Sequence, residues 1–152
     1  MSKKLRLLVA VDFSEASERA LKAAAAVARK ARASVAIVHA RPSSDLKAAV
    51  LEDRGDLVRL SPRLMRLGLA AHYRKLLKEA RRRIPGARTR LLVGWPGRTI
   101  AREAAQGYDL IVVGSRGRGA VSRTLLGSTT QDLLHRAGIP VMVVESLSRS
   151  TR

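Results

Sequence analysis

Five short apolar segments recur along this chain, and each is separated from the next by a stretch with helical spacing or by a loop rich in glycine and proline. Nearly continuous apolar runs of this length are typical of strands buried on both faces, as in parallel sheets. The alternation predicts an α/β fold: one doubly wound parallel sheet of five strands in the order 3-2-1-4-5, with helices on both faces. The predicted strands occupy residues 5–11, 34–39, 88–93, 109–113 and 139–144.

Capping residues mark the predicted helices between these strands. Ser14 is placed to cap a helix that runs to about residue 31. Ser61 and Pro62 begin a longer helix, since serine is a common cap and proline suits the first helical position. Shorter helices are expected over residues 99–106 and 128–136.

Length and composition bound the organisation of the chain. With 152 residues and 46% hydrophobic content, it suits one domain over residues 1–146, followed by a polar tail over residues 147–152. Cysteine is absent, which excludes disulfides and thiolate chemistry. We find neither a signal-peptide pattern nor a run long enough to span a bilayer, so we expect a soluble cytoplasmic protein.

The chain is strongly basic, with 30 Lys and Arg against 12 Asp and Glu and a formal net charge of +18. Such a charge attracts polyanions and anionic ligands. Because the chain has only one Trp, two Tyr and one Phe, platforms for stacking bases are scarce. Nucleic-acid binding is therefore an alternative that we do not favour over a solvated basic helix face.

A long glycine-rich loop follows the predicted fourth strand. Its glycines are Gly114, Gly117 and Gly127, and Ser128 and Thr129 then open the next predicted helix. Glycine lets a phosphate approach the main chain, and the first N–H groups of a helix bind anions. The spacing predicts a nucleotide site, although any one of these glycines alone would suit an ordinary turn.

In a doubly wound sheet, ligands bind beyond the carboxyl ends of the strands, where the strand order reverses. Here that point lies between the first and fourth strands, so Asp12 is expected opposite the glycine loop. Asp12 contacts a ligand in this interpretation; the alternative is that it only bonds the backbone of the following turn. A P-loop is excluded because its Gly-Lys-Ser/Thr run is missing, and a dinucleotide fingerprint is excluded because the glycines do not follow the first strand.

Several segments together resemble the universal stress protein family, in its ATP-binding branch. The most specific is Gly114-x2-Gly117-x9-Gly127-Ser128, which matches the nucleotide motif of that branch without a gap. The resemblance implies a Rossmann-like fold of the adenine nucleotide alpha hydrolase type. The other segments that resemble the family are residues 9–14, 37–40, 94–96 and 139–144.

The resemblance implies roles for individual residues. ATP is the implied cofactor, with Mg²⁺ held mainly by the nucleotide. Asp12 would contact the adenosine portion. The adenine pocket would be lined by backbone near Ala10, Val11 and Ala40. The ribose and phosphates would be faced by Gly114, Arg116 and Gly117, and the phosphate chain would be bound by Gly127, Ser128 and Thr129.

The resemblance also implies a homodimer through the fifth strand, which would cover an apolar edge that otherwise invites aggregation. The edge residues are Val141, Met142, Val143 and Val144.

Some residues depart from the family pattern or have a simpler interpretation. Ala40 stands where the family usually has a larger aliphatic residue, which would loosen the adenine pocket. Arg116, with Arg118 and Arg123, makes the loop more basic than ATP alone requires. His39 is expected to pack or to be hydrogen-bonded rather than to bind metal, and Trp95 is expected to pack.

Three functions remain open. The favoured one is an ATP-binding signalling module of the stress response with little or no hydrolysis, because we find no obvious general base or in-line arginine. The second is a slow ATPase or phosphotransfer enzyme that uses Asp12 or a metal-bound water. The third is nucleic-acid binding through the basic surface. We assign no catalytic residue and no metal ligand.

Overall fold

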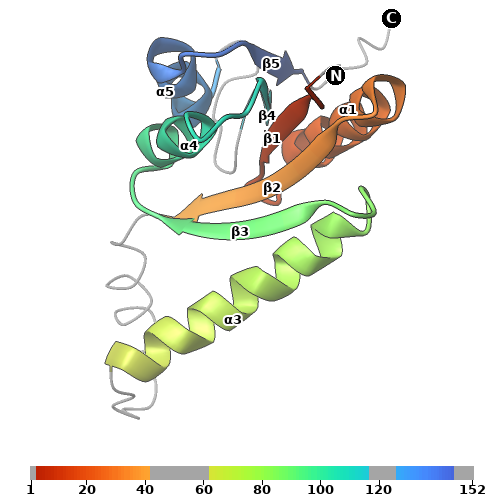
Figure 1. Cartoon of the computed structure of the whole chain (residues 1–152). Helices are drawn as coiled ribbons and strands as arrows, with labels where there is room; N and C mark the ends of the chain where they lie inside the picture. Colours follow the sequence, from red (N-terminus) through yellow and green to blue (C-terminus); the bar gives the residue numbers. More distant parts are fainter. Residues whose placement is uncertain (1–2, 42–61, 117–125, 146–152) are drawn as a thin grey trace, which may run out of the picture.

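The computed structural model describes residues 3–41, 62–116 and 126–145, and these residues form one five-stranded parallel sheet with helices on both faces. The strand order is β3-β2-β1-β4-β5, and all neighbouring pairs are parallel, as predicted (Figure 1). The strands are β1 (Arg6–Ala10), β2 (Ser34–Arg41), β3 (Arg88–Val93), β4 (Leu110–Gly114) and β5 (Val141–Val144). The helices are α1 (Glu15–Ala31), α3 (Pro62–Arg81), α4 (Pro96–Ala104) and α5 (Ser128–Arg136).

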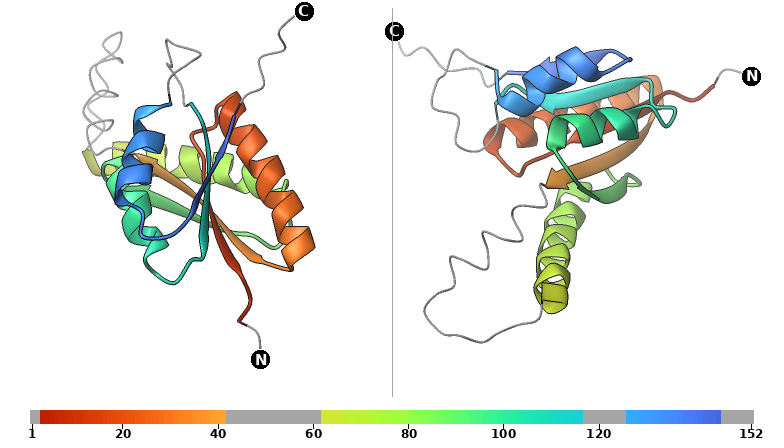
Figure 2. Two further views of the ribbon diagram at one scale, coloured as in Figure 1. Left: turned by 90° about the horizontal axis from the view of Figure 1, so that it is seen from above. Right: turned by 90° about the vertical axis from the view of Figure 1, so that its left-hand side faces the viewer.

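Two hydrophobic cores lie on opposite faces of this sheet. Side chains alternate along β1, so Leu7 and Val9 belong to one core, and Leu8 and Ala10 belong to the other. The first core packs against α1 and α3, and the second packs against α4 and α5. Seen from above, α1 lies on one side of the sheet and α4 and α5 on the other (Figure 2).

The first crossover helix begins and ends as its sequence predicts. Ser14 has extended backbone, and its side chain accepts a hydrogen bond from the N–H of Ser17 in the first turn of α1. The predicted cap Ser61 lies outside the described residues. Helix α4 begins at Pro96, three residues before the predicted start, because proline fits the first helical position.

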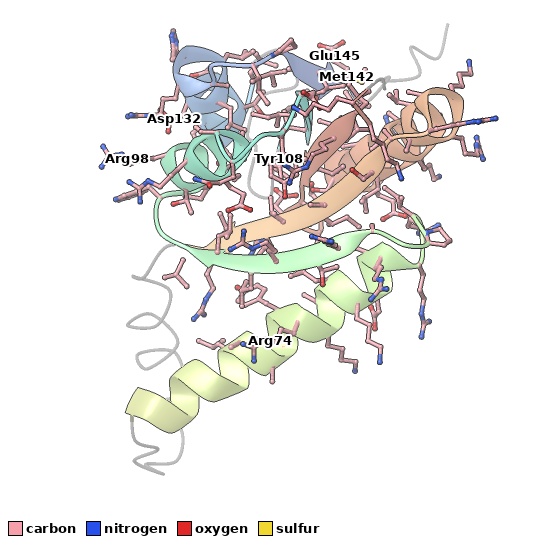
Figure 3. All side chains as sticks on the ribbon, viewed as in Figure 1. Arg74, Arg98, Tyr108, Asp132, Met142 and Glu145 are labelled. Atoms are coloured by element: carbon pink, nitrogen blue, oxygen red, sulfur yellow. The ribbon has the colours of Figure 1, made fainter. Side chains whose placement is uncertain are left out.

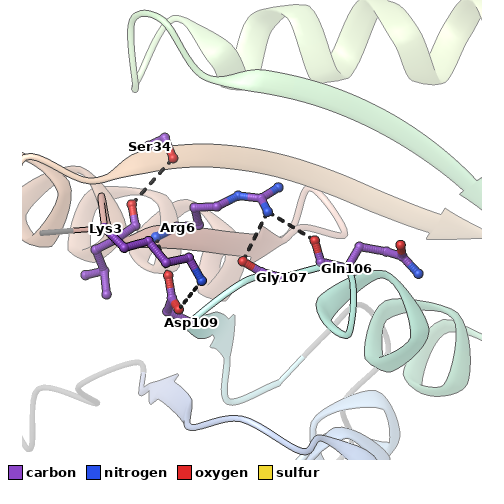
Figure 4. A network of polar contacts seen from close by, with 7 residues as sticks. Lys3, Arg6, Ser34, Gln106, Gly107 and Asp109 are labelled. Atoms are coloured by element: carbon purple, nitrogen blue, oxygen red, sulfur yellow. Dashed lines mark hydrogen bonds and ion pairs between the residues drawn. The ribbon is translucent and has the colours of Figure 1, made fainter. Parts of the chain in front are cut away.

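The amino ends of the strands are tied together by polar contacts that involve no ligand (Figure 4). The Arg6 guanidinium donates hydrogen bonds to the carbonyls of Gln106 and Gly107, at 3.0 and 3.1 Å. The backbone N–H of Arg6 donates to Asp109, which also pairs with Lys3. These contacts join β1 to the segment before β4, leaving the carboxyl ends of the two strands to form the candidate site.

Candidate functional site

A cavity of about 310 Å³ lies at the carboxyl ends of β1 and β4, where the strand order reverses. This is the position at which doubly wound sheets bind ligands, and the volume falls at the lower end of the usual range for ligand pockets. The cavity is lined by Ala10, Val11, Asp12, Ser17, Ala40, Pro96, Ile100, Val113, Gly114, Arg116, Gly127, Ser128, Thr129 and Thr130.

The structure brings the predicted site residues together around this cavity. Every one of them lines it except Gly117, which lies outside the described residues together with Arg118 and Arg123. The nine that line it come from four places in the chain: the end of β1, the end of β2, the end of β4 and the start of α5. The topology therefore unites segments that are about 115 residues apart in sequence, from Asp12 to Gly127.

The cavity wall has one apolar and one polar part. Small and aliphatic side chains from the α4/α5 face of the sheet form the apolar part, among them Ala10, Ala40 and Val113. Arg116 and the first residues of α5 form the polar part. Among the described lining residues, Asp12 is the only carboxylate. A wall of this kind suits a ligand with an apolar, ring-like end and an anionic end.

Asp12 is held in place by the first turn of α1. Its Oδ1 accepts hydrogen bonds from the backbone N–H of Ser14 at 3.0 Å and from the hydroxyls of Ser14 and Ser17. The Ser17 hydroxyl also accepts a hydrogen bond from the backbone N–H of Asp12 at 2.8 Å. The bond to the backbone of the following turn is present, and Asp12 also lines the cavity, so its contact with a ligand stays a prediction.

The chain turns sharply between Asp12 and α1. Phe13 adopts a left-handed conformation with φ of 63°, which is unfavourable for a residue with a side chain. Its ring offsets part of that strain by packing against His39, with ring centroids 4.8 Å apart, and His39 in turn packs against Tyr73 of α3. His39 is buried, and its Nδ1 lies 2.7 Å from the carbonyl oxygen of Val11, which confirms the packing and hydrogen-bonding role predicted for it.

Gly114 stands where β4 meets α1. A Cβ atom added there would lie 2.8 Å from both the carbonyl carbon and the Cβ of Ala16. Contacts that close do not occur between real side chains and backbone, so the absence of a side chain at Gly114 lets the first turn of α1 pack against the end of β4. The glycine thus serves packing as well as lining the cavity.

The first turn of α5 presents uncapped backbone N–H groups. Gly127 is the N-cap residue and has no side chain to accept from them. Two contacts fix this turn on the sheet: the Gly127 N–H donates to the carbonyl of Ser115 at 2.8 Å, and the buried Thr130 hydroxyl donates to the carbonyl of Gly114 at 2.8 Å. These contacts hold beside the cavity a helix N-terminus, the kind of backbone geometry that favours anions.

Sequence reasoning missed several lining residues and misjudged one neighbour. Ser17 could have been found from its position three residues after the Ser14 cap, where a side chain can reach back toward the preceding loop. The expectation that Trp95 packs is wrong, because Trp95, the extended residue before Pro96, is 71% exposed. The other lining residues that were not predicted are Pro96, Ile100, Val113 and Thr130.

The described residues contain no group of three or more His, Cys, Asp or Glu side chains arranged to hold a metal ion. No helix among them has the length and apolar character needed to cross a membrane.

The fold and the cavity together define an α/β protein with a cavity at the switch point of its sheet. The model of the Universal stress protein family matches residues 5–145. The chain therefore belongs to the universal stress protein family.

Relatives of this chain differ in length. A universal stress protein of Thermus aquaticus is 33% identical over 140 residues, which cover 91% of this chain and 96% of the relative. A universal stress protein of Mycobacterium tuberculosis is 39% identical over 80 residues, covering 51% of this chain. That match spans only 27% of the mycobacterial protein's own length.

Solved structures share the fold. MJ0577, a universal stress protein of Methanocaldococcus jannaschii, aligns with a TM-score of 0.78 and 23% identity over 94% of this chain and 96% of its own. A universal stress protein of Archaeoglobus fulgidus in complex with dAMP aligns at 0.61 with 24% identity, covering 92% and 97%. Another universal stress protein, in complex with cAMP, aligns at 0.67 with 23% identity, covering 95% and 98%.

Proposed function

We propose that the cavity binds an adenine nucleotide, that ATP is the preferred one, and that the protein acts as a nucleotide-dependent module of the stress response. One observation supports this proposal most strongly. At the switch point, the cavity has an apolar wall on one part, and on the other it has Arg116 and the N-terminus of α5, which has no side-chain cap. The complexes of the related proteins with dAMP and cAMP support the same class of ligand.

The residues divide between the two ends of the nucleotide. The base lies against Ala10, Val11 and Ala40, where small buried side chains leave room for a flat ring. The phosphates lie at the first turn of α5, where backbone N–H groups of Ser128 and Thr129 and the helix dipole favour negative charge. Arg116 adds charge-assisted hydrogen bonds to the phosphates.

The described part of the cavity favours binding over turnover. A general base must be able to accept a proton from the attacking water. Asp12 is the only carboxylate among the described lining residues, and three donors already occupy its Oδ1. A magnesium ion would be held mainly by the phosphates and would supply charge neutralisation there. On this basis we propose little or no hydrolysis.

The edge strand β5 is the proposed surface for a homodimer. Val141, Met142, Val143 and Val144 are all partly exposed at this edge of the sheet, and Met142 is labelled there in Figure 3. Pairing with a second copy would satisfy the free edge and cover these side chains. A cytoplasmic location stays a prediction from the sequence.

Isothermal titration calorimetry with ATP tests the proposed ligand. Wild-type protein is expected to bind ATP. The Arg116→Ala variant is expected to bind ATP more weakly and to bind adenosine as the wild type does. Arg98→Ala, which removes an exposed arginine of α4 that does not line the cavity, is the matched control. Absence of ATP binding by the wild type, together with absence of nucleotide in the mass spectrum of the purified protein, would refute the proposal. Phosphate release no faster than in buffer supports binding without turnover.

A second candidate function rests on the exposed basic face of α3. Arg74, labelled on this helix in Figure 3, belongs to this face. The exposed cations of the described part of the helix are Arg74, Lys75, Lys78 and Arg81. RNA binding through this face would weaken steeply as the salt concentration rises. Neutralising Lys78 and Arg81 would remove about two phosphate contacts and would make the plot of log K against log salt correspondingly less steep. Unchanged RNA affinity in that double variant would exclude this surface.

A further inference from the structure

We infer that Ser17 is a positioning residue for nucleotide binding: its hydroxyl fixes the Asp12 carboxylate so that this group recognises the nucleoside end of the ligand. The inference rests on the proposed nucleotide site. It adds to the adenosine contact expected of Asp12 a second residue, Ser17, that the sequence pattern did not single out.

The hydroxyl of Ser17 makes two contacts with Asp12. It accepts a hydrogen bond from the Asp12 backbone N–H at 2.8 Å and donates one to the Asp12 Oδ1. The Ser17 hydroxyl therefore holds both the main chain and the side chain of Asp12 by hydrogen bonds. Ser17 is 5% exposed and lines the cavity, so these hydrogen bonds lie within the cavity wall.

Ser17 differs from Ser14 in what it contributes. The Ser14 hydroxyl also donates to the Asp12 Oδ1, but it accepts from the N–H of Ser17 and so serves as the helix cap. Loss of Ser14 would fray α1 as well as release Asp12. Loss of the Ser17 hydroxyl would remove one of the three donors to the Asp12 Oδ1, and the acceptor of the Asp12 N–H, while the cap remains. Ser17 is therefore the position at which the orientation of Asp12 can be tested separately from the helix cap.

Packing fixes where Ser17 sits. The preceding residue, Ala16, contacts the end of β4 at Gly114, where no side chain intervenes. The first turn of α1 is therefore seated against the strand that leads into the glycine loop. Because Ser17 is the next residue along α1, this contact sets the position of the Ser17 hydroxyl relative to Asp12.

The chemistry of a carboxylate identifies the part of the ligand involved. An ionised carboxylate only accepts hydrogen bonds, so it repels phosphates and pairs with donors. The donors of an adenine nucleotide are the amino group of the base and the hydroxyls of the ribose. Asp12, held by Ser17, therefore contributes to binding of ATP and of adenosine by the same factor, whereas Arg116 contributes to ATP alone.

The experiment compares Kd values for ATP and adenosine by calorimetry. Ser17→Ala is expected to raise the Kd of both ligands by about tenfold, which is the usual effect of losing one hydrogen bond to a charged group. Ser17→Thr keeps the hydroxyl and is expected to stay within about threefold of the wild type. Ser34→Ala removes an exposed hydroxyl at the opposite end of the sheet and is the matched control.

A double-mutant cycle separates positioning from a structural role. In an Asp12→Ala background, Ser17→Ala should change the affinity by less than about twofold, because no carboxylate remains to be held. An equal loss in both backgrounds, or a loss confined to ATP, would overturn the inference. If Ser17→Ala binds both ligands with wild-type affinity, the inference about Ser17 is wrong and the proposed function still stands. If the wild-type protein binds neither ligand, the inference and the proposed function are both wrong.

Discussion

Gly114→Ala tests whether this glycine is required by the fold or by a ligand. The added Cβ would lie 2.8 Å from Ala16, where ordinary contacts begin at 3.4 Å, so α1 and β4 must separate by about 0.6 Å at this point. The neighbouring atoms belong to the backbone and Cβ of a helix, which cannot rotate away. We expect a loss of about 2–3 kcal/mol in the free energy of unfolding, near the upper end of the range for overpacking.

Urea denaturation of the ligand-free protein measures this loss, and a fall in Tm of roughly 5–10 °C should accompany it. Gly138→Ala is the control, because a Cβ there meets nothing within 4 Å; its stability should stay within about 0.5 kcal/mol of the wild type. If Gly114→Ala keeps wild-type stability and loses only nucleotide affinity, the packing argument is wrong and the glycine serves phosphate approach.

Three other substitutions test separate parts of the account, each by chemical denaturation. Phe13→Gly should be more stable than Phe13→Ala by about 1 kcal/mol, since both lose the ring but only glycine relieves the left-handed backbone; the reverse order would show that the φ of 63° carries no strain. Thr130→Val should cost about 1–2 kcal/mol by leaving the carbonyl of Gly114 without its donor, and Thr130→Ser should restore most of it. Gly68→Ala, in the interior of α3 with open space at its Cβ, should stabilise the protein by about 0.5–1 kcal/mol, and destabilisation would contradict an exposed helical site.

The sequence predicted the fold well because its signals are local and agree with one another. Strand β1, for example, lies in a short apolar run that is followed by the polar Asp12, and Ser14 caps the helix that follows. Right-handed crossovers with helices on both faces restrict the strand order, and the observed order brings Asp12 to the same cavity as Gly114 at the end of β4. Element ends were less exact, and α4 starts earlier than expected because Pro96 sits at its first turn.

The site was predicted only as far as backbone and spacing could define it. Glycine spacing pointed to Gly114 and Gly127, but it gave no sign that Gly114 is pressed against Ala16. Nor could it show that Ser17 holds Asp12, because that contact depends on where the first turn of α1 is seated. Trp95 was expected to pack, but a large apolar side chain beside a proline gives no sign of its exposure, and Trp95 is 71% exposed.

The central claim is that this cavity binds an adenine nucleotide by both of its ends, and calorimetric titration of the wild-type protein with ATP and with adenosine tests it most directly. The helix N-terminus and the charge-assisted contacts of Arg116 together should favour ATP by about 2 kcal/mol or more, which is roughly 30-fold in Kd. Binding of both ligands, with ATP the tighter by that factor, is the predicted result. No binding of either ligand, or adenosine bound as tightly as ATP, would contradict the account.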